Sequence, residues 1–191
     1  SNAMPMNISN TKERILAVAE ALIQKDGYNA FSFKDIATAI NIKTASIHYH
    51  FPSKEDLGVA VISWHTDKIA AVLSDISNNS SLSAKEKIQK FFDAILTLTY
   101  NSENKMCLGG MFASDFQSLP VSIQNQAKKF FELIIEWLKG VLETNGYDNE
   151  SSLSLAKQII SLVEGGLLLA RLYGDETFLE GVRHFIDQTI K

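Results

Sequence analysis

Apolar residues recur at every third or fourth position along most of the sequence, the spacing that places them on one face of an α-helix. No segment shows the strict alternation of apolar and polar residues that marks a half-buried β-strand. Because 46% of the residues are hydrophobic and 21% are charged, the chain can bury a substantial core. We therefore expect an all-α protein of about nine helices.

Capping and turn residues indicate where these helices begin and end. A polar residue followed three positions later by a carboxylate opens a helix at Asn10, Ser53 and Ser83. Glycine at positions 27 and 146 is suited to end one. The expected helices lie between Asn10 and Gly27, from Ser32 to Ile40, over residues 44–50 and 54–74, from Ser83 onwards, over 106–119, between Pro120 and Gly146, and over 152–173 and 175–190.

The first three helices crowd into residues 8–53, which we predict to be one domain, followed by a helical body over residues 54–191. Asn41 lies where the chain must turn, and asparagine tolerates the left-handed conformation. Ile36, Ile40 and Ile47 are expected to hold the two short helices together. The outward residues are then small, hydroxylic or cationic, which suits a DNA groove: Lys43, Thr44, Ala45, Ser46, His48 and Tyr49.

Other uses of this cluster have less support. His48 and His50 are two positions apart, which on a helix directs them to different sides, so we predict no metal site. The sequence holds no Gly-rich phosphate loop, G-x-S-x-G or H-E-x-x-H motif, and we expect no cofactor. The alternative is an all-α small-molecule carrier or enzyme whose N-terminal helices are only structural. The titratable candidates form no catalytic pattern: Asp93, Asp115, Glu164 and Arg171.

The segment IATAINIKTASIHYHFPSKEDL, residues 36–57, resembles the DNA-binding region of TetR-family transcriptional regulators, and the resemblance extends over residues 11–61. It implies a three-helix helix-turn-helix head and an α-helical body that binds a ligand and dimerises. The implied partners are a palindromic DNA duplex, a second copy of the chain and a small effector. The resemblance places the DNA contacts at Lys43, Thr44, Ala45, Ser46, His48, Tyr49, His50 and Lys54, with Lys54 meeting a phosphate.

Three residues depart from the family pattern. Asn41 replaces the usual glycine, His48 replaces a tyrosine, and Lys43 replaces the serine that often caps the recognition helix, which shifts the expected cap to Thr44. Charge is compatible with a DNA-facing head on an acidic body. Residues 1–57 carry six basic and six acidic side chains, so the formal net charge of −4 comes from the remainder.

Large apolar residues mark the expected effector site in the body. Such residues are core in most helical bundles, but methionine beside paired glycines also suits a deformable pocket wall, so we expect a largely apolar ligand. Cys107 lies in an apolar context that makes a thiol inert rather than a redox sensor. The candidate lining is Trp64, Phe91, Phe92, Ile95, Met106, Met111, Phe112, Phe116, Phe130, Ile134 and Trp137.

The eighth helix is apolar most of the way round, more than one intrachain face requires, and so predicts a homodimer. Gly165 and Gly166 suggest a close backbone approach or a kink. The candidate interface is Ile159, Leu162, Val163, Gly166 and Leu167. The apolar run 159–170 is short for a membrane span, and a single cysteine forms no internal disulfide, so we expect a cytoplasmic protein without a membrane partner.

Overall fold

The computed structural model describes residues 10–191, and within that range it is built from α-helices and two short 3-10 turns. This confirms the predicted all-α class and the number of helices. The helices are α1 (Thr11–Asp26), α2 (Phe33–Ile40), α3 (Thr44–His50), α4 (Lys54–Asn78), α5 (Ala84–Leu98), α6 (Leu108–Ser114), α7 (Val121–Thr144), α8 (Asn149–Tyr173) and α9 (Thr177–Thr189), with turns η1 (Tyr28–Ala30) and η2 (Phe116–Ser118).

Local capping chemistry sets most of the helix boundaries, as the sequence predicts. The side chain of Asn10 accepts a hydrogen bond from the amide of Glu13 at 2.7 Å, and Gly27 ends α1 with a φ of 88°. Reciprocal capping boxes open three later helices, at Ser32, Ser53 and Ser83. Each box satisfies amides that would otherwise lack partners at a helix start.

Four boundaries differ from the prediction. α4 continues to Asn78, past the predicted end at residue 74, because Leu73 and Ile76 still pack on the core. α8 begins earlier, at Asn149, because Asp148 caps it through the amide of Ser151. α9 begins at Thr177, not residue 175. The segment 106–119 yields only the short helix α6 and the turn η2, which agrees with its paired glycines.

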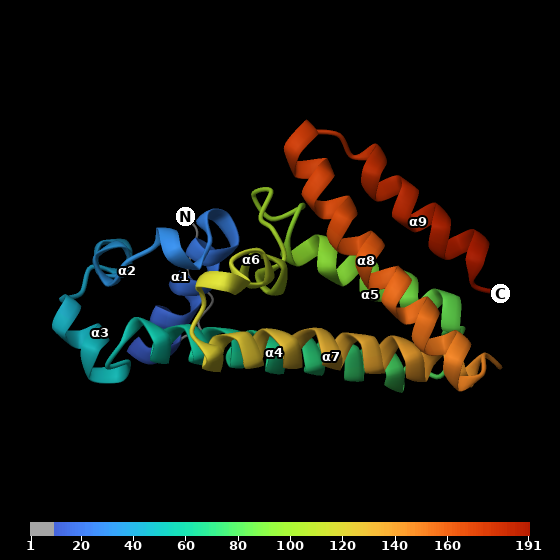
Figure 1. The fold of residues 1–191 in the computed structure, drawn as a ribbon, viewed down its shortest axis with the longest axis horizontal. Helices are drawn as coiled ribbons and strands as arrows, with labels where there is room; N and C mark the ends of the chain where they lie inside the picture. The colour runs from blue at the N-terminus through green and yellow to red at the C-terminus, as the bar shows by residue number, and fades with distance from the viewer. Residues whose placement is uncertain (1–9) are drawn as a thin grey trace.

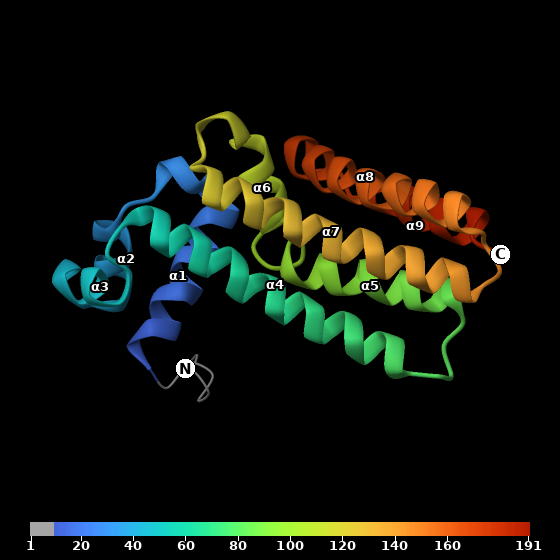
Figure 2. The ribbon, with the colours of Figure 1, turned by 60° about the horizontal axis from the view of Figure 1, so that its bottom comes forward.

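The helices form two connected parts (Figure 1). α1, α2 and α3 make a head at one end, and the long helix α4 leads from it into the body. There α4 packs beside α7, α7 packs against α8, and α8 pairs with α9, while α6 bridges α1 and α7 (Figure 2). The predicted boundary between residues 53 and 54 falls at the cap of α4, and the predicted start at residue 8 lies outside the described residues.

Among the described residues, α8 is the one helix long and apolar enough to cross a membrane by length and composition. Its apolar side chains pack against α7 and α9, and nine of its residues are buried within the chain. The apolar character of α8 is therefore that of a core helix that also keeps one outer face.

Candidate nucleic-acid interface and regulatory body

The turn between α2 and α3 fixes the orientation of α3. Asn41 ends α2 in the left-handed conformation, with φ of 55° and ψ of 53°. The guanidinium of Arg14 on α1 donates to the carbonyl of Ile40 at 3.2 Å, which ties the turn to the first helix. Ile47 is fully buried and Phe51 nearly so, so α3 is anchored along its inner side. The geometry is that of a helix-turn-helix unit.

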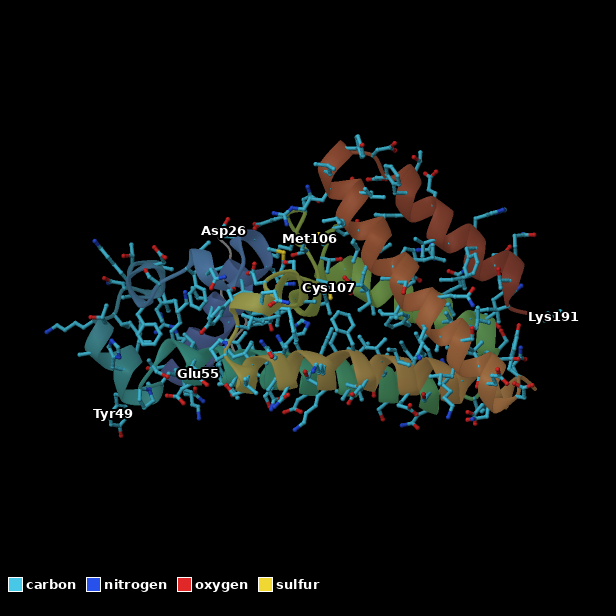
Figure 3. All side chains as sticks on the ribbon, viewed as in Figure 1. Asp26, Tyr49, Glu55, Met106, Cys107 and Lys191 are labelled. Atoms are coloured by element: carbon cyan, nitrogen blue, oxygen red, sulfur yellow. The ribbon has the colours of Figure 1, made fainter. Side chains whose placement is uncertain are left out.

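The outer side of α3 carries the residues that the sequence singles out. Lys43, Thr44, Ala45, His48 and Tyr49 are exposed, and Ser46 and His50 are half-buried. Tyr49 is 84% exposed and points away from the head at the end of the molecule, as Figure 3 shows. So large an exposed aromatic ring suits contact with another molecule.

Two details of α3 differ from the expectation. The helix starts after Lys43, which occupies the cap position without a side-chain hydrogen bond, so the predicted transfer of the cap to Thr44 is wrong. His48 turns back: its Nδ1 lies 3.3 Å from the carbonyl oxygen of Pro52 and its ring centroid 4.6 Å from that of Phe33. These contacts hold His48 toward the end of α3 and toward α2.

The structure also adds a residue to the candidate surface. Thr11, the first residue of α1, lines a shallow hollow together with Ala45, Ser46, Tyr49 and His50. Sequence reasoning missed Thr11 because it is more than thirty positions away in the chain. Its place at a helix start is the signal that could have found it, since amides there are free to meet a phosphate.

Lys54, the predicted phosphate ligand, is held against two aromatic rings. Its Nζ lies 4.8 Å from the ring centroid of Tyr28 and 4.7 Å from that of Phe31. Burial lowers the pKa of the Lys54 ammonium, and the nearby charge of Asp35 acts in the opposite direction. A contact of Lys54 with DNA remains a prediction.

The head is fastened to the body through α1. The carboxylate of Glu20 lies 3.0 Å from Nδ1 of His65 and 2.8 Å from Nζ of Lys68, both on α4. Burial alone would raise the pKa of Glu20, but hydrogen bonds and charges from His65 and Lys68 outweigh it, and the pKa lies below its ordinary value. This cluster joins the head to the helix that runs into the body.

A second fastening joins the end of α1 to the segment before α6. The buried amide of Gln24 donates to the carbonyls of Leu98 and Met106, each at 3.2 Å, and the amide of Met106 donates to the carbonyl of Gln24. The guanidinium of Arg171 on α8 donates to the carbonyl of Lys25 at 2.9 Å. Gln24 had no place in the sequence prediction, because nothing local marks a glutamine as buried.

Most of the predicted pocket residues lie in the core of the body. Trp64, Met111 and Trp137 are half-buried at its margin. Phe116 lies apart, 37% exposed, beside a shallow surface groove of about 230 Å³ between α7 and the α6 region. The remaining residues pack together and are buried: Phe91, Phe92, Ile95, Met106, Phe112, Phe130 and Ile134. Their role as a ligand site stays a prediction.

The predicted interface residues of α8 divide between two faces. Ile159, Val163 and Leu167 are buried within the chain. A Cβ atom at Gly166 would lie 2.8 Å from a methyl carbon of Val182 on α9, so the close approach expected of Gly166 occurs inside one chain. Leu162 is 38% exposed, and it alone of the five predicted residues is available to a partner.

Two comparisons decide the family. A model of the bacterial regulatory proteins of the tetR family matches residues 15–61, which span most of the head and the start of α4. A model of the C-terminal domain of LmrA/YxaF-like transcriptional regulators matches residues 84–184. The chain belongs to the TetR family.

Individual relatives agree with this assignment. An uncharacterised helix-turn-helix regulator of Bacillus subtilis, YxaF, is 28% identical over 170 residues, 88% of each chain. The negative regulator IcaR of the biofilm operon icaADBC of Staphylococcus aureus is 26% identical over 129 residues, 63% of this chain and 69% of IcaR. A TetR-family regulator of Agrobacterium tumefaciens superposes with a TM-score of 0.87 at 27% identity, covering 94% of this chain and 97% of that one.

This TetR-family protein is therefore a DNA-binding transcriptional regulator and not an enzyme. The alternative of an all-α enzyme or carrier with purely structural N-terminal helices is wrong. The recognition helix inferred from residues 44–50 is α3, with the same bounds.

Proposed function

We propose that this TetR-family regulator is a repressor that binds a palindromic operator as a symmetric dimer and is released by a small, largely apolar effector. The observation that carries the proposal is the outer side of α3, where Tyr49 is 84% exposed while Ile47, two residues earlier, is fully buried. A helix anchored so firmly on one side and so open on the other can enter a major groove without rearrangement.

The outer face of α8 supports the dimer. Its exposed apolar residues recur at helical spacing, and Leu172 is 71% exposed. A contiguous apolar stripe of this kind favours burial against a second copy. The proposed interface is Leu162, Leu168, Leu169, Leu172 and Tyr173. Two-fold symmetry in the protein then demands two-fold symmetry in the operator, with half-sites about one helical turn apart.

Repression and release are argued from a relative and from the make-up of the body. IcaR is named a negative regulator, which favours repression for this relative of it. The aromatic and aliphatic core of the body favours an apolar effector, and α4 runs from Lys54 at the head to Trp64 in the body. A ligand releases DNA only through its different affinity for two dimer shapes, typically about 1–3 kcal/mol.

Selection of bound duplexes from random DNA, followed by a salt titration, tests the proposal. We expect a palindrome, and we expect Lys43→Ala to flatten the salt dependence by about one unit of slope. Lys90→Ala, an exposed lysine of α5 far from the head, is the matched control and should change nothing. Ser46→Ala and Tyr49→Ala should change the preferred sequence. Selection of no duplex, or an effect of Lys90 equal to that of Lys43, would contradict the assignment of the surface.

A further inference from the structure

Glu164 on α8 has a carboxylate oxygen without a partner. Its Oε2 is the one side-chain nitrogen or oxygen of residues 10–191 that is both buried and without a hydrogen bond. The residue as a whole is only partly buried, but its carboxylate end is shielded from water. Buried polar groups are nearly always satisfied in folded proteins, so an exception calls for a physical reason.

The surroundings of this carboxylate come from α6. A Cβ atom at Gly110 would lie 2.7 Å from Oε2, so the carboxylate rests directly against the backbone of α6. Cys107 lies at the same place, since a Cβ atom at Gly110 would lie 3.7 Å from the Cβ of Cys107. Burial raises the pKa of the Cys107 thiol, and the nearby charge of Glu164 raises it further. None of the ion pairs of the described chain involves Glu164.

A role in stabilising the fold does not explain why the carboxylate of Glu164 is buried. An ionised carboxylate offers about four acceptor positions, and the neighbouring thiol is at best a weak donor. Burial raises the pKa of Glu164 to about 7, while the nearby thiol of Cys107 lowers it slightly, so the carboxyl is partly ionised near neutral pH.

We propose that Glu164 is the polar anchor of the effector site and that it accepts a hydrogen bond from a largely apolar ligand with an ammonium or hydroxyl group at one end. The inference rests on the proposed function, because it names the chemistry of the effector that the body takes. An ammonium head is the strongest fit, since it supplies both donors and the compensating charge. An anionic head is disfavoured by repulsion from the ionised form of the carboxyl group.

The neighbourhood suits such a ligand. Gly109, which precedes Gly110 on α6, packs against the rings of Phe130 and Phe131 on α7. Aromatic rings favour both an apolar body and a cationic head. α6 is only seven residues long and carries two adjacent glycines, so it is the element best able to shift and admit a ligand.

A ligand at Glu164 would act on the head through α6. Cys107 follows Met106 directly, and both backbone groups of Met106 are bonded to Gln24 near the end of α1. In Figure 3, Met106 and Cys107 lie between the head and the centre of the body. Movement of residues 107–110 away from α8 therefore pulls on the hydrogen bonds that fasten the head.

Isothermal calorimetry of the full chain with three octyl probes, kept below their micelle concentrations, tests the anchor. We expect n-octylammonium to bind most tightly, 1-octanol next, and octanoate at least tenfold more weakly than n-octylammonium. Glu164→Gln should remove the preference for ammonium. Glu150→Gln, an exposed carboxylate on the same helix, is the matched control and should keep the preference.

Octanoate that binds as tightly as n-octylammonium, no binding of any octyl probe, or a preference that survives in Glu164→Gln overturns the inference. Circular dichroism confirms that the variant is folded. Binding of the wild-type chain and of Glu164→Gln to the selected operator is measured in parallel. If the chain binds the operator normally but shows no preference among the probes, the proposed role of Glu164 is wrong and the DNA-binding function is unaffected. If the chain does not bind the operator, the proposed function itself is contradicted.

Discussion

Replacing Glu164 with glutamine should change how the stability of the protein depends on pH. The pKa of Glu164 is raised from 4.5 to about 7 in the folded chain. A carboxyl with a raised folded-state pKa leaves the fold fully stable below its unfolded pKa, and stability is lost as pH rises through the folded pKa. The wild type therefore loses stability between about pH 4.5 and pH 7, and a glutamine, which does not ionise, removes that loss.

The magnitude follows from the shift. One pKa unit corresponds to about 1.4 kcal/mol, so the whole shift is worth about 3.4 kcal/mol, of which about 2.5 kcal/mol is lost between pH 5 and pH 8. Water that reaches the partly exposed stem reduces the effect, so we expect the variant to gain about 1–2.5 kcal/mol on the wild type over this interval. Groups that are common to both proteins cancel in the difference.

Urea unfolding at pH 5 and pH 8, followed by circular dichroism at one fixed protein concentration, measures the difference. The concentration must be fixed because dimerisation contributes to apparent stability. Glu150→Gln serves again as the control, and its stability difference from the wild type should be the same at both pH values. An equal difference at both pH values for Glu164→Gln would refute the reasoning, because the carboxyl would then be as well solvated as in the unfolded chain.

Three further outcomes are expected. Gln24→Leu leaves the carbonyls of Leu98 and Met106 without their donor, and it should lower the free energy of unfolding in urea by about 1–3 kcal/mol and weaken operator binding. Unchanged stability and unchanged operator binding would show that these hydrogen bonds do not couple the head to the body. Gly166→Leu should lower the melting temperature, because its side chain collides with α9 inside the chain, and a pure loss of dimer without destabilisation would contradict this placement. Leu172→Glu should give a folded monomer in sedimentation. A dimer that persists in this variant would show that the interface does not include Leu172.

Features that depend on local chemistry could be predicted from the sequence. Ser32, Ser53 and Ser83 cap helices through carboxylates three positions on, and such pairs need no knowledge of the rest of the chain. The left-handed turn at Asn41 belongs to the same kind. The bounds of α3 follow from Asn41 on one side and Pro52 on the other.

Features that depend on which elements meet could not be predicted in this way. The sequence predicts Gly166 at a partner interface because it reveals an apolar helix but not that α9 folds back on that helix. The sequence places Glu164 only among titratable residues without a catalytic pattern, because its burial arises from contact with α6, more than fifty positions earlier. The burial of Gln24 could not be predicted for the same reason, because its hydrogen-bond partners lie at the end of α5 and just before α6.

The two-sided character of α8 has an evolutionary consequence. Its inner residues are shared with α7 and α9, so most substitutions there would cost the cell the folded protein. Its outer residues include Leu168, which is 57% exposed, and Leu172, which is 71% exposed, so changes there disturb the single chain little. If this face is the dimer interface, as proposed, duplicated genes of this regulator can diverge there alone and stop pairing with each other while each keeps its own fold. A few changes on one side of one helix would then suffice to prevent two sister regulators in one genome from forming mixed dimers.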